Sequence, residues 1–205
     1  MVLRTIFNSS SATKENALNQ FKLKNLSLLS FEENERFNDE DLKDFLYTQK
    51  DSVEALELGR TLSNDVYELI LNKFVNLKTL RIDISAFPAD LGFYKRINAV
   101  KNVTKLIIHG ENGDTVLYCT ILNLFPNATD ISFSSRTLFE LFSWLSKCCI
   151  GVTSLTLDRF CPGYRNVNFS ALKNFRYVNF NDEQNWCEFV MSNRIIESLC
   201  FDSIC

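Results

Sequence analysis

The chain contains a single histidine, His109, and a base–acid pair is the most reactive arrangement that the sequence suggests. Asp83 and Asp158 occupy positions equivalent to His109 in other copies of a sequence repeat, so either carboxylate could orient the imidazole. A hydrolase would also need an activated nucleophile and donors for an oxyanion. No Ser or Cys lies in a nucleophile motif, and no oxyanion feature is visible. We therefore expect no catalytic residue and predict that the chain is not an enzyme.

Metal and cofactor binding also lack a sequence signal. The seven cysteines include no C-x-x-C pair, and Cys148-Cys149 has no His or further Cys at ligand spacing. Neither G-x-x-x-x-G-K-[ST] nor G-x-G-x-x-G occurs, so nucleotide binding has no support. We expect neither a metal nor a cofactor.

The segments that would position His109 belong to an internal repeat. Residues 103–108 follow the pattern L-x-x-L-x-L, in which L is any apolar residue, and eight stretches of the chain fit it. By subtraction of residue numbers, their middle apolar members are 21 to 30 residues apart, close to the period of about 20–29 that is typical of leucine-rich repeats. These middle members are Leu26, Leu56, Leu80, Leu106, Ile131, Leu155, Val178 and Leu199.

The repeat predicts the fold. The last two apolar residues of each copy are two apart, so they point to one face of a short strand that no single copy can bury. Stacked copies would bury that face together. We expect an α/β leucine-rich-repeat solenoid, a curved parallel sheet with outer helices and about eight repeats, over residues 23–205. Residues 1–22 would form a partial N-terminal cap or linker.

Helical patterns occupy most of the gaps between the expected strands. Asn38 and Ser63 are candidate N-caps, and acidic residues at 39–41 suit the first turn of a helix. The connection at 159–168 contains Pro162 and Gly163 and predicts an irregular turn, whose Phe160 and Tyr164 are either contacts for a partner or packing over a shortened repeat. The expected helices cover residues 39–46, 63–74, 97–100, 116–125, 137–147 and 184–191.

Three residues of each repeat should face the open, concave side of the sheet. They precede the middle apolar residue, follow it, and follow the last apolar residue. Arginine and tyrosine are common anchors of protein interfaces, which makes Arg81 and Tyr177 the leading candidates. The alternative is a sheet face that is polar only because water covers it. The candidate partner-binding residues are Arg81, Asp83, Lys105, Ile107, His109, Asp130, Asp158, Tyr177, Asn179 and Asn181.

Composition limits the kind of partner. The net charge of −3, a pI of about 5.3 and the lack of a Lys/Arg cluster argue against nucleic acid. No apolar run approaches the roughly 18 residues of a membrane span, and the N-terminal segment does not fit a secretory signal peptide. The odd number of cysteines without framework spacing favours a reducing compartment. We expect an intracellular protein, cytoplasmic or nuclear, that binds neither nucleic acid nor membrane.

Two segments combine an outer helix, a short turn and an L-x-x-L-x-L strand: Asn38–Leu58 and Leu122–Ile131. They resemble the ribonuclease-inhibitor-like repeats of intracellular leucine-rich-repeat proteins and, more narrowly, the repeat region of F-box/leucine-rich-repeat proteins. In that family the repeats bind the protein to be ubiquitinated, and an N-terminal F-box docks on the Skp1 adaptor of a cullin ubiquitin ligase.

No F-box-like segment precedes the repeats in this sequence. The resemblance therefore implies the ligase role, with a Skp1–cullin complex as partner, only for a longer parent chain or a divergent relative. From the repeats themselves we expect a non-catalytic scaffold that binds a protein on the concave face. The alternative is a structural or oligomerising repeat fragment with no ligand of its own.

Overall fold

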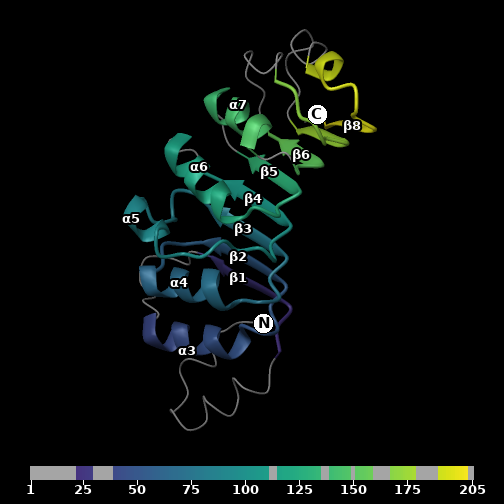
Figure 1. The fold of residues 1–205 in the computed structure, drawn as a ribbon. Coiled ribbons are helices and arrows are strands. Elements are labelled where there is room, and N and C mark those ends of the chain that lie inside the picture. The colour runs from purple at the N-terminus through teal and green to yellow at the C-terminus, as the bar shows by residue number, and fades with distance from the viewer. Residues whose placement is uncertain are drawn as a thin grey trace.

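The structure is a computed structural model that describes residues 22–29, 39–110, 115–134, 139–148, 151–158, 167–178 and 189–202. Eight strands form one all-parallel sheet whose spatial order is the order of the chain, and the two end strands do not pair with one another (Figure 1). The predicted α/β solenoid of about eight repeats is therefore confirmed. The strands are β1 (Asn25–Leu29), β2 (Ala55–Gly59), β3 (Thr79–Asp83), β4 (Lys105–His109), β5 (Asp130–Ser134), β6 (Ser154–Leu157), β7 (Asn174–Val178) and β8 (Ser198–Asp202).

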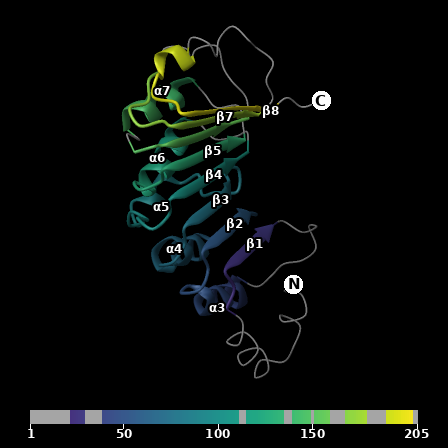
Figure 2. The same cartoon turned by 90° about the vertical axis from the view of Figure 1, so that its right-hand side faces the viewer.

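The described helices between the strands all cover the same face of the sheet, as two perpendicular views show (Figures 1 and 2). Two adjacent parallel strands need a long crossover connection, which here is usually a helix. Each helix buries its apolar stripe against the strands. Within the described residues, no helix is long and apolar enough to cross a membrane. The helices are α3 (Asp39–Gln49), α4 (Asn64–Lys73), α5 (Leu91–Tyr94), α6 (Thr115–Leu124) and α7 (Phe139–Cys148).

The short helix expected at 97–100 was wrongly placed. The helical turn comes earlier, in α5, where Oδ1 of Asp90 accepts a hydrogen bond of 2.8 Å from the Gly92 backbone N–H. Ile97 and Val100 are buried, but they lie in the connection that follows the helix. Two apolar residues at this spacing fit a helix and also fit a non-helical connection that packs onto the core. The spacing alone therefore did not distinguish a helix from a connection.

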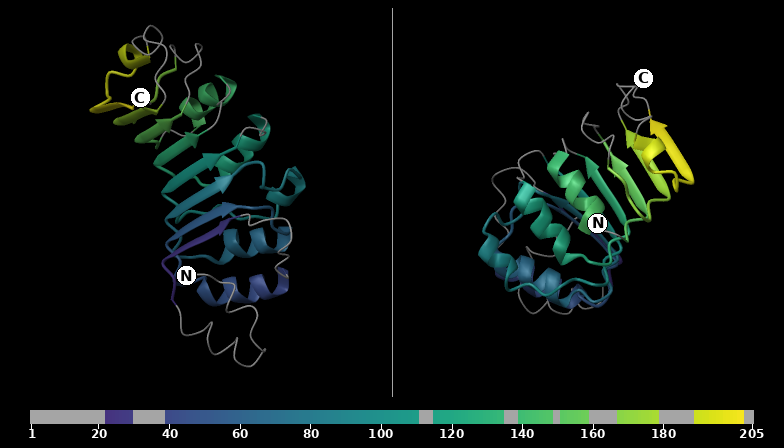
Figure 3. Two further views of the ribbon diagram at one scale, coloured as in Figure 1. Left: turned by 180° about the vertical axis from the view of Figure 1, so that it is seen from behind. Right: turned by 45° about the horizontal axis from the view of Figure 1, so that its top comes forward.

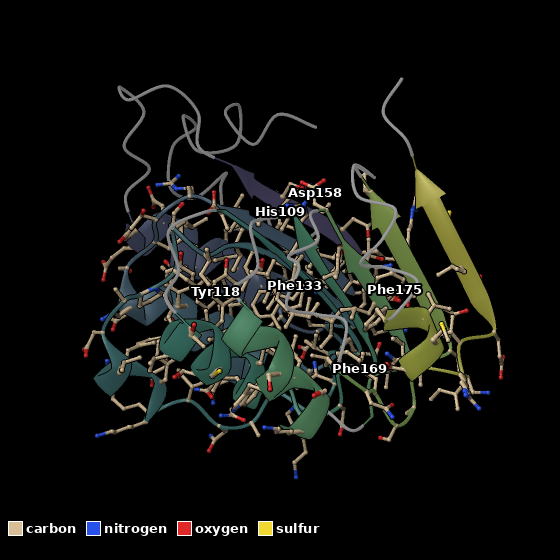
Figure 4. The ribbon with its side chains drawn as sticks, turned by 90° about the horizontal axis from the view of Figure 1, so that it is seen from above. His109, Tyr118, Phe133, Asp158, Phe169 and Phe175 are labelled. Carbon is tan, nitrogen blue, oxygen red and sulfur yellow. The ribbon has the colours of Figure 1, made fainter. Side chains whose placement is uncertain are left out.

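The core lies between the helices and the sheet. The middle apolar residues of the repeats are buried, with exposed fractions of 0% for Leu80 and Leu106 and 1% for Leu155. Seen along the stack, Tyr118, Phe133, Phe169 and Phe175 lie between the two layers (Figure 4). Each repeat therefore covers its neighbour, as expected for a solenoid.

Asparagine side chains connect successive repeats just before the strands begin. Asn76, Asn102 and Asn127 each precede the first apolar residue of their repeat. The Nδ2 of Asn76 donates a hydrogen bond of 2.8 Å to the Asp51 carbonyl, and that of Asn127 donates one of 2.7 Å to the Lys101 carbonyl. The Nδ2 of Asn102 donates to the carbonyls of Phe74 and Leu77, both at 2.8 Å. These bonds satisfy turn carbonyls of the preceding repeat and fix the stacking register.

The first six strands and β8 pair in the predicted register. For β7 the predicted register, with Val178 as the middle apolar residue, was wrong. Phe175, rather than Val178, pairs with Leu155 of β6 and Leu199 of β8. Two overlapping copies of the pattern share Phe175, one beginning at Leu172 and the other at Phe175 itself. Leu172 is fully buried, so it serves as the first apolar residue and the earlier copy forms the repeat.

Candidate functional site

The candidate site lies on the open face, which we define as the sheet face opposite α3–α7. In the view from behind, no described helix covers this face (Figure 3). Side chains alternate along each strand, so that in β2 and β4 the inward residues are buried and the others partly or fully accessible. The register aligns the candidate residues in rows across β3, β4 and β5. The predicted residues that the register brings to the open face are Arg81, Asp83, Lys105, Ile107, His109 and Asp130.

Asp158 follows β6, and its backbone N–H continues the ladder with a bond of 3.0 Å to the Phe133 carbonyl. It lies in the same row as His109, towards the ends of the strands (Figure 4). The loop at 160–164 lies outside the described residues, as do Asn179 and Asn181.

Tyr177 was predicted to lie on the open face, and the register of β7 contradicts this. Its backbone pairs with Leu157 and Phe201, which are positions of the inward-facing row. Arg176 occupies the open-face position instead, in register with Thr156 and Cys200, and its side chain is exposed. The sequence could have indicated Arg176, because Leu172, Phe175 and Tyr177 fit the L-x-x-L-x-L pattern as well as Phe175, Val178 and Phe180 do.

The most connected group on the open face is the Arg81 cluster, which consists of Ser27, Glu57, Arg81 and His109. The Arg81 Nε lies 3.2 Å from Glu57 Oε1 and donates a hydrogen bond to His109 Nε2. The Ser27 hydroxyl donates a bond of 3.0 Å to Glu57 Oε2. Four adjacent strands, β1 to β4, thus contribute one residue each. Ser27 and Glu57 were absent from the predicted site, although they belong to the same row as Arg81.

Burial and the Arg81 contact both favour the neutral form of His109. An imidazole nitrogen that accepts a hydrogen bond must be unprotonated, and arginine can only donate. Burial is the main cause that lowers the pKa of His109, and the Arg81 charge lowers it further, while Glu57, Asp83 and Asp158 raise it. The net effect is a pKa below the ordinary histidine value.

The contacts of Asp83 give it a role other than orienting His109. Oδ1 of Asp83 accepts hydrogen bonds from the Ser85 backbone N–H at 2.9 Å and the Ser85 hydroxyl at 2.6 Å, so the carboxylate caps its own turn. The Nε2 of His109 faces a guanidinium in place of a nucleophile. That the chain is not an enzyme stays a prediction.

A hollow of about 170 Å³ opens on the face beside the Arg81 cluster. It forms over β2 because Ala55 has only a methyl group between Asn25 and Thr79 of the neighbouring strands. Arg81 and Ile107 line it as well. Small-molecule sites are usually about 300–1,000 Å³, so this hollow suits one side chain rather than a whole ligand.

Several charged groups near the open face form ion pairs. Lys105 Nζ lies 2.8 Å from Asp130 Oδ2, an ion pair across β4 and β5. At the start of the strands, Glu54 lies 3.1 Å from Lys24 and 3.0 Å from Lys78, and the Lys78 hydrogen bond is the main cause that lowers the pKa of Glu54. Exposed pairs of this kind contribute little to stability and mainly fix charge positions.

A second hollow, of about 430 Å³, lies on the helix side of the molecule. Lys43 and Asp65, which line it, form an ion pair at 3.5 Å, and Asn72 Oδ1 accepts a bond of 3.2 Å from the Asn98 backbone N–H. No group of three or more potential metal ligands occurs among the described residues.

The repeats define a class of fold, an α/β solenoid that is compatible with the leucine-rich-repeat type. The sequence matches no protein-family model and no curated protein. The function must therefore be argued from the surface itself.

Proposed function

We propose that the chain is a non-catalytic scaffold that binds a protein partner on its open face, through the segment β1 to β4. The observation that carries this proposal is the Arg81 cluster beside the hollow at Ala55. An interface anchor needs a well-held side chain beside a recess, and arginine is one of the residues that most often supply binding energy. Arg81 has both properties, because Glu57 and His109 hold its Nε and the recess adjoins it.

The more specific form of the proposal is substrate recognition for an F-box-type ubiquitin ligase. Its support is the resemblance of residues 38–58 and 122–131 to F-box/leucine-rich-repeat proteins. The open face would then hold the protein to be ubiquitinated, and a Skp1–cullin complex would join through an F-box in a longer parent chain.

Site-specific photo-cross-linking in the native cells tests the proposal. A photoreactive residue replaces Thr79 on the open face, and in a matched control it replaces Val116, which is 57% exposed on α6. We expect a discrete covalent adduct from position 79 and none from position 116. Adducts from position 116 alone, or from neither position, would overturn the proposal. Mass spectrometry of the adduct would identify the partner, and Skp1 with a cullin in the same complex would support the ligase role.

A second candidate function is end-to-end association through β8. Leu199 is 38% exposed and Ile195 44% exposed, and β8 pairs only with β7 among the described strands. An exposed strand edge with apolar side chains favours pairing with another chain. Light scattering across a range of concentrations should then show a mass that rises towards a dimer, whereas a constant monomer mass would exclude this candidate.

A further inference from the structure

The donors of the Arg81 guanidinium are only partly used. Arginine has five N–H donors. Both contacts that Arg81 makes with described residues involve Nε, so within that part of the chain the two Nη nitrogens donate no hydrogen bond. The side chain is 46% exposed, so the Nη atoms can be reached from outside.

The acceptors around Arg81 are, in contrast, already engaged. The two oxygens of Glu57 face Ser27 and Arg81, and the Nε2 of His109 faces Arg81. Glu57 lines the hollow too, but both of its oxygens already have a partner, and Arg81 balances its charge. The donors of the cluster that remain for a ligand are the two Nη nitrogens of Arg81.

The rim of the hollow adds to this donor character. In the described part of the chain, the side chains of Asn25 and Thr79 make no hydrogen bond, and both line the hollow with Arg81. An amide N–H and a hydroxyl can each donate to an oxygen.

The contacts of Nε also limit the motion of the guanidinium. A guanidinium held at Nε presents its Nη atoms as a fixed fork, which matches the two oxygens of a carboxylate. Such preorganisation lowers the entropy cost of binding.

We infer that the Arg81 hollow binds the carboxylate of an aspartate or glutamate side chain in an extended segment of the partner protein. The side chain would lie over Ala55 and Ile107, with its oxygens on the Arg81 Nη atoms and near Asn25 and Thr79. This inference rests on the proposed function, because it names the chemistry that the same face recognises.

A peptide array on the full chain tests the inference. The probes are seven-residue peptide pools with random flanks and a central Glu, Gln, Asp or Asn. Because charge-assisted bonds are about twice as strong as neutral ones, we expect the acidic pools to bind about tenfold more tightly than the matching amide pools. The variant Arg81→Gln should lose this preference. The matched control is Arg176→Gln, which removes one charge from the same row and should keep the preference.

Arg81→Lys separates charge from geometry, since lysine keeps the charge but has no fork; we expect it to retain only part of the preference. Circular dichroism of each variant excludes loss of folding as the cause. Equal binding of acidic and amide pools by the wild type, or equal effects of the two Gln variants, would overturn the carboxylate site and leave the scaffold function standing. No binding of any pool would overturn the carboxylate site, while the cross-linking experiment would still decide the scaffold function.

Discussion

The same position of the repeat has different surroundings at the two ends of the solenoid. From β1 to β7 the middle apolar residue, from Leu26 to Phe175, is between 0 and 6% exposed. In β8 that residue is Leu199, and it is 38% exposed. Leu155 and Leu199 are both leucines at equivalent positions, so the residue type does not explain the difference. What differs is the neighbouring repeat, and stability in this fold is therefore a property of the interface between repeats.

The amide side chains that connect successive repeats also differ in burial along the sheet; Gln49 near the N-terminal end is 0% exposed and accepts a bond of 3.0 Å from the Leu23 N–H. Between β2 and β5 the connections are asparagines at the turns, such as Asn76, which is exposed. Near the C-terminal end the connection is Asn193, which is only 1% exposed. Its Oδ1 accepts a bond of 2.7 Å from the Phe169 N–H, and its Nδ2 donates to the carbonyls of Val167 and Phe189, both at 2.8 Å.

The largest expected effect comes from truncating the middle apolar residue in the covered part of the sheet. Leu106→Ala removes a side chain that is 0% exposed and should lower the free energy of unfolding by about 2–5 kcal/mol. Leu199→Ala should cost less than about half as much, because that side chain is already partly in water. Urea unfolding followed by circular dichroism measures both. Equal losses would show that something covers Leu199 in solution, and a concentration-dependent loss would identify it as a second copy.

The second-largest expected effect is the loss of stability when an asparagine that connects two repeats is replaced by alanine. Asn193→Ala leaves the buried N–H of Phe169 without its partner, and we expect a loss of about 1–3 kcal/mol for that group. Asn76→Ala removes one exposed bond to the Asp51 carbonyl, which water can replace, so about 1 kcal/mol or less should be lost. The urea midpoints of the two variants, compared at equal slope, give the difference. If Asn76→Ala cost as much as Asn193→Ala, the contrast between buried and exposed amides would be wrong.

The fold could be predicted because the core repeats a simple spacing. Leu56, Leu80 and Leu106 each lie in an unambiguous L-x-x-L-x-L stretch, and their strands pair in the predicted register. The register of β7 could not be chosen in the same way, since Leu172, Phe175 and Val178 satisfy two overlapping copies of the pattern. Burial of Leu172 decides between them, and burial depends on the packed structure.

The rows of the open face were predicted where the register was right, but the contacts within them were not. The sequence placed Arg81, Asp83, His109 and Asp158 on one face, where a carboxylate was only one conceivable partner of His109. The structure instead has Arg81 in contact with His109 and Asp83 in contact with Ser85. Such contacts depend on rotamers, which the periodicity does not determine. The hollow at Ala55 was missed because residues of four adjacent strands line it, and no single motif contains them.

The smallest expected effect is the pH dependence of the free energy of unfolding that results from His109, at the end of β4. Its pKa in the folded protein lies below the ordinary value, so the unfolded chain takes up a proton first as the pH falls. The contribution of neutral His109 to the free energy of unfolding is complete above the ordinary histidine pKa. It is lost as the pH falls through the lower pKa of the folded state. His109→Gln provides an amide oxygen for the Arg81 Nε at every pH and should remove this dependence. Urea midpoints of the wild type and the variant at pH 7.5, 6.0 and 5.0 should therefore converge towards neutral pH and separate on acidification, with the wild type less stable. A constant difference across this range would mean that burial and the Arg81 contact do not lower the pKa of His109 in the folded protein.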